Sequence, residues 1–173
     1  MTGVQTCALP IYAGRRGLGL PSLLPCTPMG CMRLLNTVVD NFNGLHAVVI
    51  GRSDLVGKPM AQLLLAAGCT VTHIHKATLN PSALCAQADI VVAAAGHAGL
   101  VQAHWLKIGA VVIDVGINRD ANGTLTGDVD FASAMGIASA ISPVPGGVGP
   151  MTVACLLENT VQAAENIQQA IVL

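Results

Sequence analysis

The sequence contains few aromatic residues and few charges. Its 173 residues include one tryptophan, one tyrosine and two phenylalanines, and charged residues make up 10% of the total. Eight lysines and arginines against nine aspartates and glutamates give a net charge of −1, and the basic residues form no stripe. Proteins that bind nucleic acid need clustered basic residues and aromatic side chains that stack on bases. We therefore expect no nucleic-acid partner.

Long apolar runs are also missing, although 53% of the residues are hydrophobic. A membrane-spanning helix needs about 18 consecutive apolar residues, and glycines and His97 interrupt the most apolar segment, residues 89–101. The N-terminus lacks the charged-then-apolar order of a secretion signal. The sequence therefore predicts a packed globular core and no membrane association.

The cysteines show no C-x-x-C spacing. They are Cys7, Cys26, Cys31, Cys69, Cys85 and Cys155. Most lie in apolar surroundings, where a reduced cysteine behaves as a small hydrophobic residue, so we expect a reduced, cytoplasmic protein. His73 and His75 would point to the same face of a strand, but no third ligand lies near them in the sequence. We expect no metal site.

Short runs rich in valine and isoleucine alternate with helical patterns along the chain. Strands are expected within residues 44–51, 69–75, 89–96, 109–116 and 136–144, and helices within 26–38, 58–68, 80–88 and 149–171. Thr27 is the expected N-cap of the first helix, and Asn122-Gly123 indicates a hairpin turn. Such alternation predicts an α/β fold of Rossmann type, a doubly wound and mostly parallel sheet with helices on both faces.

Gly51 and Gly57 frame the turn between the first strand and its helix. A glycine after a strand lets a phosphate approach the backbone, and the following helix N-terminus favours negative charge. Ser53 could cap this helix or donate its hydroxyl to a phosphate. Gly57 would allow close packing of the helix on the strand. The spacing departs from G-x-G-x-x-G, so an ordinary tight turn remains an alternative.

The end of the next strand carries basic residues in place of an acid. An NAD-binding unit usually places Asp or Glu about 20 residues after its glycines, whereas this chain has His75 and Lys76 there and no acid between His73 and Asp89. Arg52 would lie on the same rim. Cations there would attract the 2′-phosphate of NADP. The alternative is that Arg52 and Lys76 are solvated surface charges.

A segment rich in proline and glycine follows the last expected strand. Residues 141–152, ISPVPGGVGPMT, hold three prolines and three glycines. Proline stiffness and glycine freedom together produce a rigid loop with an unusual path. Such a loop either shapes a site or serves as a structural connector, and composition leaves both open.

Six motifs in order resemble one known family, the bifunctional methylenetetrahydrofolate dehydrogenase/methenyltetrahydrofolate cyclohydrolases. They are PCTPMG, GRSDLVGKPM, AGHAGLV, VIDVGINR, GDVDF and PVPGGVGPMTVACLLENT. The resemblance implies NADP-dependent oxidation of 5,10-methylenetetrahydrofolate and hydrolysis of the product to 10-formyltetrahydrofolate. It also implies a homodimeric full-length protein that binds tetrahydrofolate derivatives between a catalytic domain and a Rossmann domain.

The resemblance assigns residues to both ligands. It places the cofactor on Gly51, Arg52, Ser53, His75, Lys76 and Ile117, and it lines the folate pocket with Pro145, Gly146, Gly147, Val148 and Gly149. Arg52 would contact the 2′-phosphate, and Ile117 would present its backbone to the nicotinamide. Lys76 stands where the family has serine, and His97 where it usually has lysine.

The catalytic Tyr-x-x-x-Lys motif of the family is absent, because no tyrosine precedes Lys58, Lys76 or Lys107 by four positions. We therefore assign no catalytic residue. Residues 1–11 look foreign or unstructured, 12–150 form the NADP-binding domain, and 151–173 form a C-terminal helix that in the family packs on the catalytic domain. Its apolar stripe, at Val153, Leu156, Leu157 and Val161, would lie exposed or fold back onto the sheet.

The sequence is compatible with three functions. The chain is part of the bifunctional folate enzyme, or a catalytically inert NADP(H)-binding module, or another NADP-dependent Rossmann oxidoreductase such as a shikimate-dehydrogenase-like protein. The proline- and glycine-rich loop argues against the third.

Overall fold

The computed structural model describes residues 14–15, 17–120 and 122–171. Five strands form one parallel sheet in the order β2-β1-β3-β4-β7. They are β1 (His46–Ile50), β2 (Thr70–Ile74), β3 (Ile90–Ala93), β4 (Val111–Asp114) and β7 (Ala140–Ile141). The α/β, Rossmann-type prediction is confirmed.

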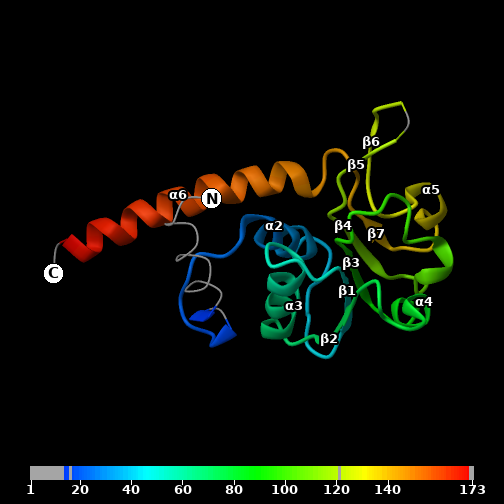
Figure 1. Cartoon of the computed structure of the whole chain (residues 1–173). Helices are drawn as coiled ribbons and strands as arrows, with labels where there is room; N and C mark the ends of the chain where they lie inside the picture. The colour runs from blue at the N-terminus through cyan, green and yellow to red at the C-terminus, as the bar shows by residue number, and fades with distance from the viewer. Residues whose placement is uncertain (1–13, 16, 121, 172–173) are drawn as a thin grey trace.

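Apolar residues cover both faces of the central strands because helices pack on each side (Figure 1). On one face α2 (Cys26–Leu35) and α3 (Gly57–Ala66) contribute Leu35, Met60 and Leu64 to a core with Val49 and Val92. The opposite face packs Val48 and Val91 against residues of α4 (Pro81–Cys85), η1 (Ala103–Trp105) and α5 (Phe131–Ala134). Successive strand residues point to opposite faces, which explains the unbroken Val and Ile runs of a parallel sheet.

The polar excursion after β4 is a hairpin, as the Asn-Gly pair predicts. Strands β5 (Asn118–Arg119) and β6 (Leu125–Thr126) pair antiparallel, and Gly123 has φ +80°. The hairpin projects from the body beside the sheet edge (Figure 1). The short helix α5 that follows was not expected from the sequence.

The N-cap assignment of Thr27 is wrong. Helix α2 begins at Cys26 and is preceded by Pro25. The Thr27 hydroxyl instead accepts a hydrogen bond from the Thr152 hydroxyl at 3.2 Å, which joins α2 to the last helix. A threonine can cap a helix only from the position just before it.

The last helix, α6 (Val148–Ile171), packs its first half on α2 and extends past the body (Figure 1). Its start precedes the domain boundary expected at residue 151. Arg33 and Glu158 pair at 2.6 Å, and the Asn159 side chain donates to the carbonyl of Leu24 at 2.7 Å. A Cβ added to Gly30 would lie 3.0 Å from that of Met151, so the glycine permits the close helix contact.

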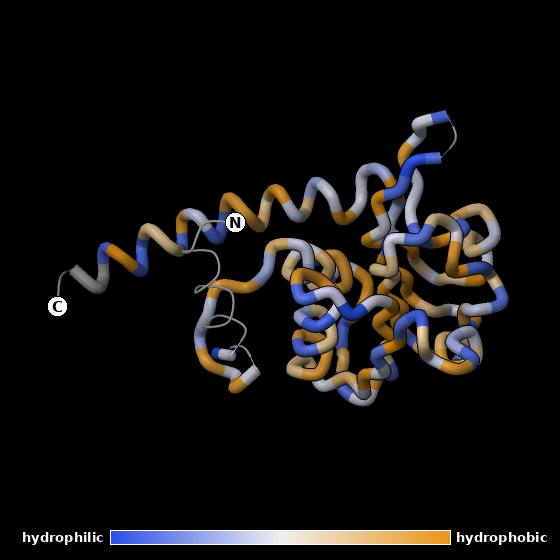
Figure 2. The backbone as a smooth tube through the Cα atoms, in the orientation of Figure 1, coloured by the Kyte–Doolittle hydropathy of each residue, from blue (hydrophilic) through white to orange (hydrophobic). Residues whose placement is uncertain are grey.

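Apolar residues recur along α6, as the repeated orange segments of this helix in Figure 2 show, and some of them form an exposed stripe. Val153, Leu156, Leu157 and Val161 are 55–65% exposed. Within the described residues this stripe therefore does not fold back onto the sheet, which was the alternative to exposure. Its spacing of three to four residues is that of a helix face which packs on a partner.

The helices of the described residues include none long and apolar enough to cross a membrane. No group of three potential ligands for a metal occurs among those residues. The assignment of residues 1–11 as foreign or unstructured lies outside the described part.

Candidate functional site

The turn after β1 depends on two glycines. Gly51 has φ +109°, and a Cβ on it would lie 2.0 Å from the carbonyl oxygen of Ala94. A Cβ on Gly57 would lie 2.0 Å from the carbonyl oxygen of Gly51. A side chain at either position would collide with backbone. Gly51 therefore permits the close approach of the ends of β1 and β3, and Gly57 permits the close approach of α3 to the end of β1. The close approach expected of Gly57 is present.

Ser53 supports the turn from inside it. Its Oγ accepts hydrogen bonds from the backbone N–H groups of Val56 and Gly57, at 3.2 and 3.3 Å. These two bonds use the acceptor capacity of the hydroxyl and leave its O–H as a donor. Ser53 is exposed. It can therefore stabilise the helix start and still donate to an anion above the turn.

His73 holds the same turn from the neighbouring strand, which the sequence did not reveal. Its Nε2 is hydrogen-bonded to the carbonyl oxygen of Gly51. A carbonyl oxygen only accepts, so Nε2 must carry the proton. His73 therefore supports the turn through this bond.

The basic residues follow two paired strands. Strands β1 and β2 run parallel with Ile50 opposite Ile74, and the N–H of Gly51 donates to the carbonyl of Ile74 at 2.9 Å. Arg52 and Lys76 therefore follow their strands at corresponding positions, at the carboxyl end of the sheet. Both are exposed.

Arg52 and Lys76 have no acidic partner among the described residues. Within the described part of the chain, salt bridges involve Arg33, Lys58 and Lys107. The nearest acid in sequence to Arg52 is Asp54, and it pairs with Lys58 at 2.6 Å. This end of the sheet thus keeps uncompensated positive charge, as a phosphate group would require.

His75, which directly precedes Lys76, keeps one ring nitrogen for a ligand. The ring Nδ1 of His75 accepts a hydrogen bond from the backbone N–H of Ala77 at 3.2 Å. The backbone N–H of His75 donates to the Thr78 hydroxyl at 2.9 Å. The backbone here is therefore fixed, while Nε2 forms no hydrogen bond among the described residues. A ring whose Nδ1 accepts carries its proton on Nε2, which can donate to an anion.

A cavity of about 500 Å³ opens beside the glycine turn, at the ends of β4 and β7. The proline- and glycine-rich loop and the start of α6 form one wall. The lining residues are Thr27, Val56, Asp114, Val115, Gly116, Ile117, Leu125, Pro143, Val144, Pro145, Gly146, Gly147, Val148, Gly149, Pro150 and Thr152. The lining is mostly apolar, and the volume lies within the range of small-molecule sites.

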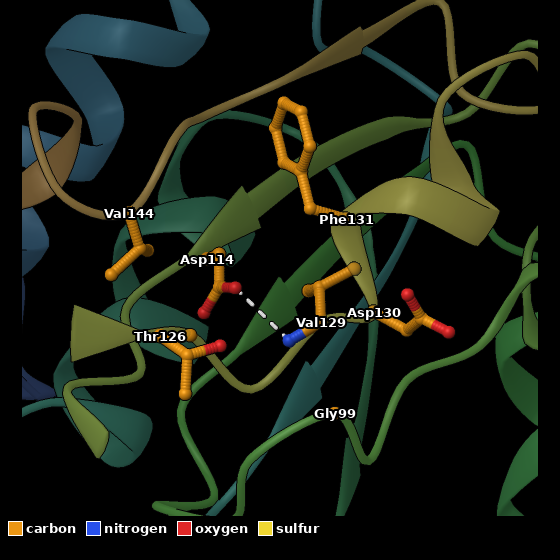
Figure 3. Close-up of a pocket in the computed structure, with 8 residues that line it drawn as sticks. Gly99, Asp114, Thr126, Val129, Asp130, Phe131 and Val144 are labelled. Atoms are coloured by element: carbon orange, nitrogen blue, oxygen red, sulfur yellow. Dashed lines mark hydrogen bonds between the residues drawn. The ribbon is translucent and has the colours of Figure 1, made fainter. Parts of the chain in front are cut away.

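A second, smaller cavity of about 230 Å³ shares Asp114 and Val144 with the first, and Figure 3 shows its lining. Its other lining residues are Gly99, Thr126, Gly127, Val129, Asp130 and Phe131. Figure 3 shows the Asp114 carboxylate between Thr126 and Val129, with the hydrogen bond from the Val129 N–H marked. Asp114 therefore stands between the two cavities.

Asp114 is a buried carboxyl group held by backbone donors. Its oxygens accept from the N–H groups of Gly116, Asp128 and Val129 at 2.9–3.0 Å. Burial raises the pKa of Asp114 above its ordinary value, and the three N–H donors partly oppose this rise. Asp114 therefore orients the loop that follows β4.

The structure thus divides the expected site residues into two neighbouring groups. Ile117 and the segment from Pro145 to Gly149 line one cavity, whereas residues 51–53 and 75–76 form the rim at the ends of β1 and β2. Val56, in the turn before α3, belongs to the cavity wall and links the groups. The sequence did not predict four of the residues that line the cavity, because their apolar or small side chains carry no chemical signal. They are Thr27, Val56, Leu125 and Thr152.

Comparisons with a family model and with curated proteins point to the same family. A family model described as "Tetrahydrofolate dehydrogenase/cyclohydrolase, NAD(P)-binding domain" matches residues 25–168. The bifunctional protein FolD of Zymomonas mobilis subsp. mobilis is 60% identical over 170 residues, which cover 92% of this chain and 57% of that protein. The chain spans about half the length of the curated relatives it matches.

Two solved structures extend the comparison to three dimensions. The bifunctional FolD enzyme of Campylobacter jejuni superposes with a TM-score of 0.88 at 49% identity, over 91% of this chain and 56% of that one. The Trypanosoma brucei enzyme, solved with NADP cofactor and an inhibitor, gives 0.83 at 42% identity, over 90% and 56%.

Proposed function

Because the chain belongs to the tetrahydrofolate dehydrogenase/cyclohydrolase family and matches its NAD(P)-binding domain, we propose that it is the cofactor-binding part of a bifunctional folate enzyme. That enzyme oxidises 5,10-methylenetetrahydrofolate with NADP and hydrolyses the methenyl product to 10-formyltetrahydrofolate. The unpaired cations at the ends of β1 and β2 carry the cofactor assignment, because they suit a 2′-phosphate and no acid is positioned for a free ribose hydroxyl.

The residues of the rim fit NADP in distinct ways. Gly51 would bend the chain beneath the diphosphate, because its φ of +109° is one that glycine adopts readily and other residues rarely do. Ser53 has a hydroxyl proton to donate, and Arg52, His75 and Lys76 supply donors for the 2′-phosphate. When bound, the nicotinamide ring of NADP⁺ accepts a hydride. Ile117, 74% exposed at the cavity, would meet that ring with its backbone.

The cavity of about 500 Å³ is the proposed folate site. Five residues of its wall would contact the substrate and exclude water from the one-carbon bridge. They are Pro145, Gly146, Gly147, Val148 and Gly149. A mostly apolar wall suits a flat pteridine ring, with few polar groups to fix its orientation. The inhibitor complex of the Trypanosoma brucei relative supports a second small-molecule site beside the cofactor.

The isolated chain is proposed to bind NADP(H) without catalysing either reaction. It contains no Tyr-x-x-x-Lys segment, so a residue that moves the substrate proton is not available in it. Homodimerisation and a cytoplasmic location belong to the proposal for the full-length protein. The five described cysteines are all free, which supports a reducing compartment.

Fluorescence titration of the purified chain with NADPH and NADH tests the proposed function. NADPH should bind at least about tenfold more tightly than NADH, because only NADPH offers the extra phosphate. Equal affinities, or no binding of either, would contradict the assignment. Turnover of methylenetetrahydrofolate by this chain would show instead that it is not inert.

A further inference from the structure

Asp128 is a buried carboxylate that collects four hydrogen bonds from two loops. It is 0% exposed. Its Oδ2 accepts from the N–H groups of Ala95 and Gly96, at 2.7 and 2.8 Å. Its Oδ1 accepts from the N–H of His97 and the side-chain amide of Asn118, both at 2.8 Å. One side chain therefore ties the loop after β3 to the hairpin that follows β4.

Asp114 and Asp128 hold each other's segments. The N–H of Asp128 donates to Asp114, and Asp128 in turn lies directly against Gly116, two residues after Asp114. A Cβ on Gly116 would be 2.4 Å from an Asp128 oxygen, and one on Gly127 would be 1.8 Å from an Asp114 oxygen. Each glycine therefore leaves the space that the carboxylate of the other segment occupies. These contacts bring the motifs VIDVGIN and GDVD together in the fold.

These loops lie on the side of the site away from the 2′-phosphate rim. Strands β3 and β4 follow β1 in the sheet order, whereas the rim residues leave from β1 and β2. Ile117 stands between Gly116 and Asn118, both of which contact Asp128. Fixing these two neighbours fixes the backbone that is expected to meet the nicotinamide.

We propose that Asp128 is a positioning residue for the nicotinamide half of the cofactor, acting by fixing the backbone of residues 95–97 and of the Gly116–Asn118 segment. This inference rests on the proposed function, because it presupposes NADP(H) at the strand ends. It goes beyond that proposal by assigning a role to a side chain that touches neither cofactor nor substrate.

Asp128→Asn is a sharp probe because all four partners of the carboxylate are donors. Either orientation of an asparagine amide places its NH₂ group against the N–H donors on one side, so those partly buried donors lose their acceptor. Asp130→Asn is the matched control. It makes the same chemical change two residues away, where the side chain accepts only the Ser133 N–H at the start of α5 and an asparagine caps about as well.

The experiment compares two ligands on the wild-type chain and both variants. NADPH reports on the whole cofactor, and adenosine 2′,5′-bisphosphate carries only the adenosine half with its 2′-phosphate. We expect Asp128→Asn to raise the dissociation constant of NADPH about tenfold or more and that of the bisphosphate less than about twofold. Asp130→Asn should change neither. Hydrogen exchange without ligand should show faster exchange of the amides of residues 95–97 in Asp128→Asn alone.

The outcomes separate this inference from the proposed function. Equal losses for both ligands would show general structural damage and overturn the positioning role, as would unchanged NADPH binding. If Asp128→Asn fails to fold, Asn118→Ala removes one of the four bonds and should produce a smaller loss confined to NADPH. A wild-type chain that binds neither ligand would contradict the proposed function itself, and the inference would fall with it.

Discussion

The carbonyl oxygen of Gly51 occupies space that a Cβ of Gly57 would need, at 2.0 Å from its ideal position. The two residues therefore bring the start of α3 against the end of β1. Gly57→Ala should cost about 3 kcal/mol or more of unfolding free energy, because backbone must shift to admit the methyl group. Urea denaturation measures this.

Gly149→Ala is the control for that variant. Gly149 lies in α6 with no atom near its added Cβ and no positive φ. Alanine should there leave stability unchanged or raise it by up to about 1 kcal/mol. Similar losses at the two positions would show that the close approach at Gly57 has no energetic consequence.

Arg52→Ala should weaken NADPH binding about 10- to 100-fold and leave NADH binding within about twofold, since only NADPH offers a charged partner for the guanidinium. Lys58→Ala removes the same charge nearby from a side chain that pairs with Asp54, and it should preserve the preference. If the two variants behave alike, the effect belongs to general charge and not to a contact with Arg52.

Leu156→Glu combined with Leu157→Glu should reduce self-association of the chain without lowering its melting temperature. Both leucines lie on the exposed stripe of α6 and contribute little to the hydrophobic core of the chain. Exposed apolar stripes favour association. Sedimentation velocity at increasing concentration measures the change. Gln162→Glu, an exposed position on the same helix, is the control and should associate like wild type. A wild-type chain that stays monomeric at high concentration would disprove this prediction.

Lys107→Met should lower stability at neutral pH by about 0.2–1 kcal/mol. The Lys107 ammonium and then the N–H of His46 lower the pKa of Asp89 below its ordinary value of 3.8. A carboxyl group with a lowered folded-state pKa stabilises the fold above its unfolded pKa, and this contribution disappears as pH falls through the folded value. The difference between wild type and variant should therefore shrink below pH 3.8. A difference that is constant from neutral pH into this acid range would refute the linkage.

The sheet and the turns were predictable because their signals are local. The runs Val48–Ile50 and Val111–Ile113 read directly as buried parallel strands, and Gly51 and Asn122-Gly123 marked turns that the structure contains. Glycine and asparagine leave such signals because few residues tolerate the backbone conformations of tight turns.

The supporting contacts could not be predicted because they join distant residues. Asp128 reads as an ordinary turn residue, yet its partners Ala95, Gly96 and His97 lie more than 30 residues earlier. His73 reads as a strand residue, and only the folded chain brings its ring to Gly51. Thr27 had the composition of an N-cap but lies one position inside the helix. Local patterns indicate elements, whereas side-chain partners depend on how the elements meet.

A crystal structure of this chain with NADP⁺ tests the central claim most directly. The account predicts the 2′-phosphate at the ends of β1 and β2, with an oxygen about 3 Å from the Arg52 guanidinium, and the diphosphate over the turn between Gly51 and Gly57. A cofactor bound elsewhere, or a 2′-phosphate that points into solvent away from both Arg52 and Lys76, would contradict it.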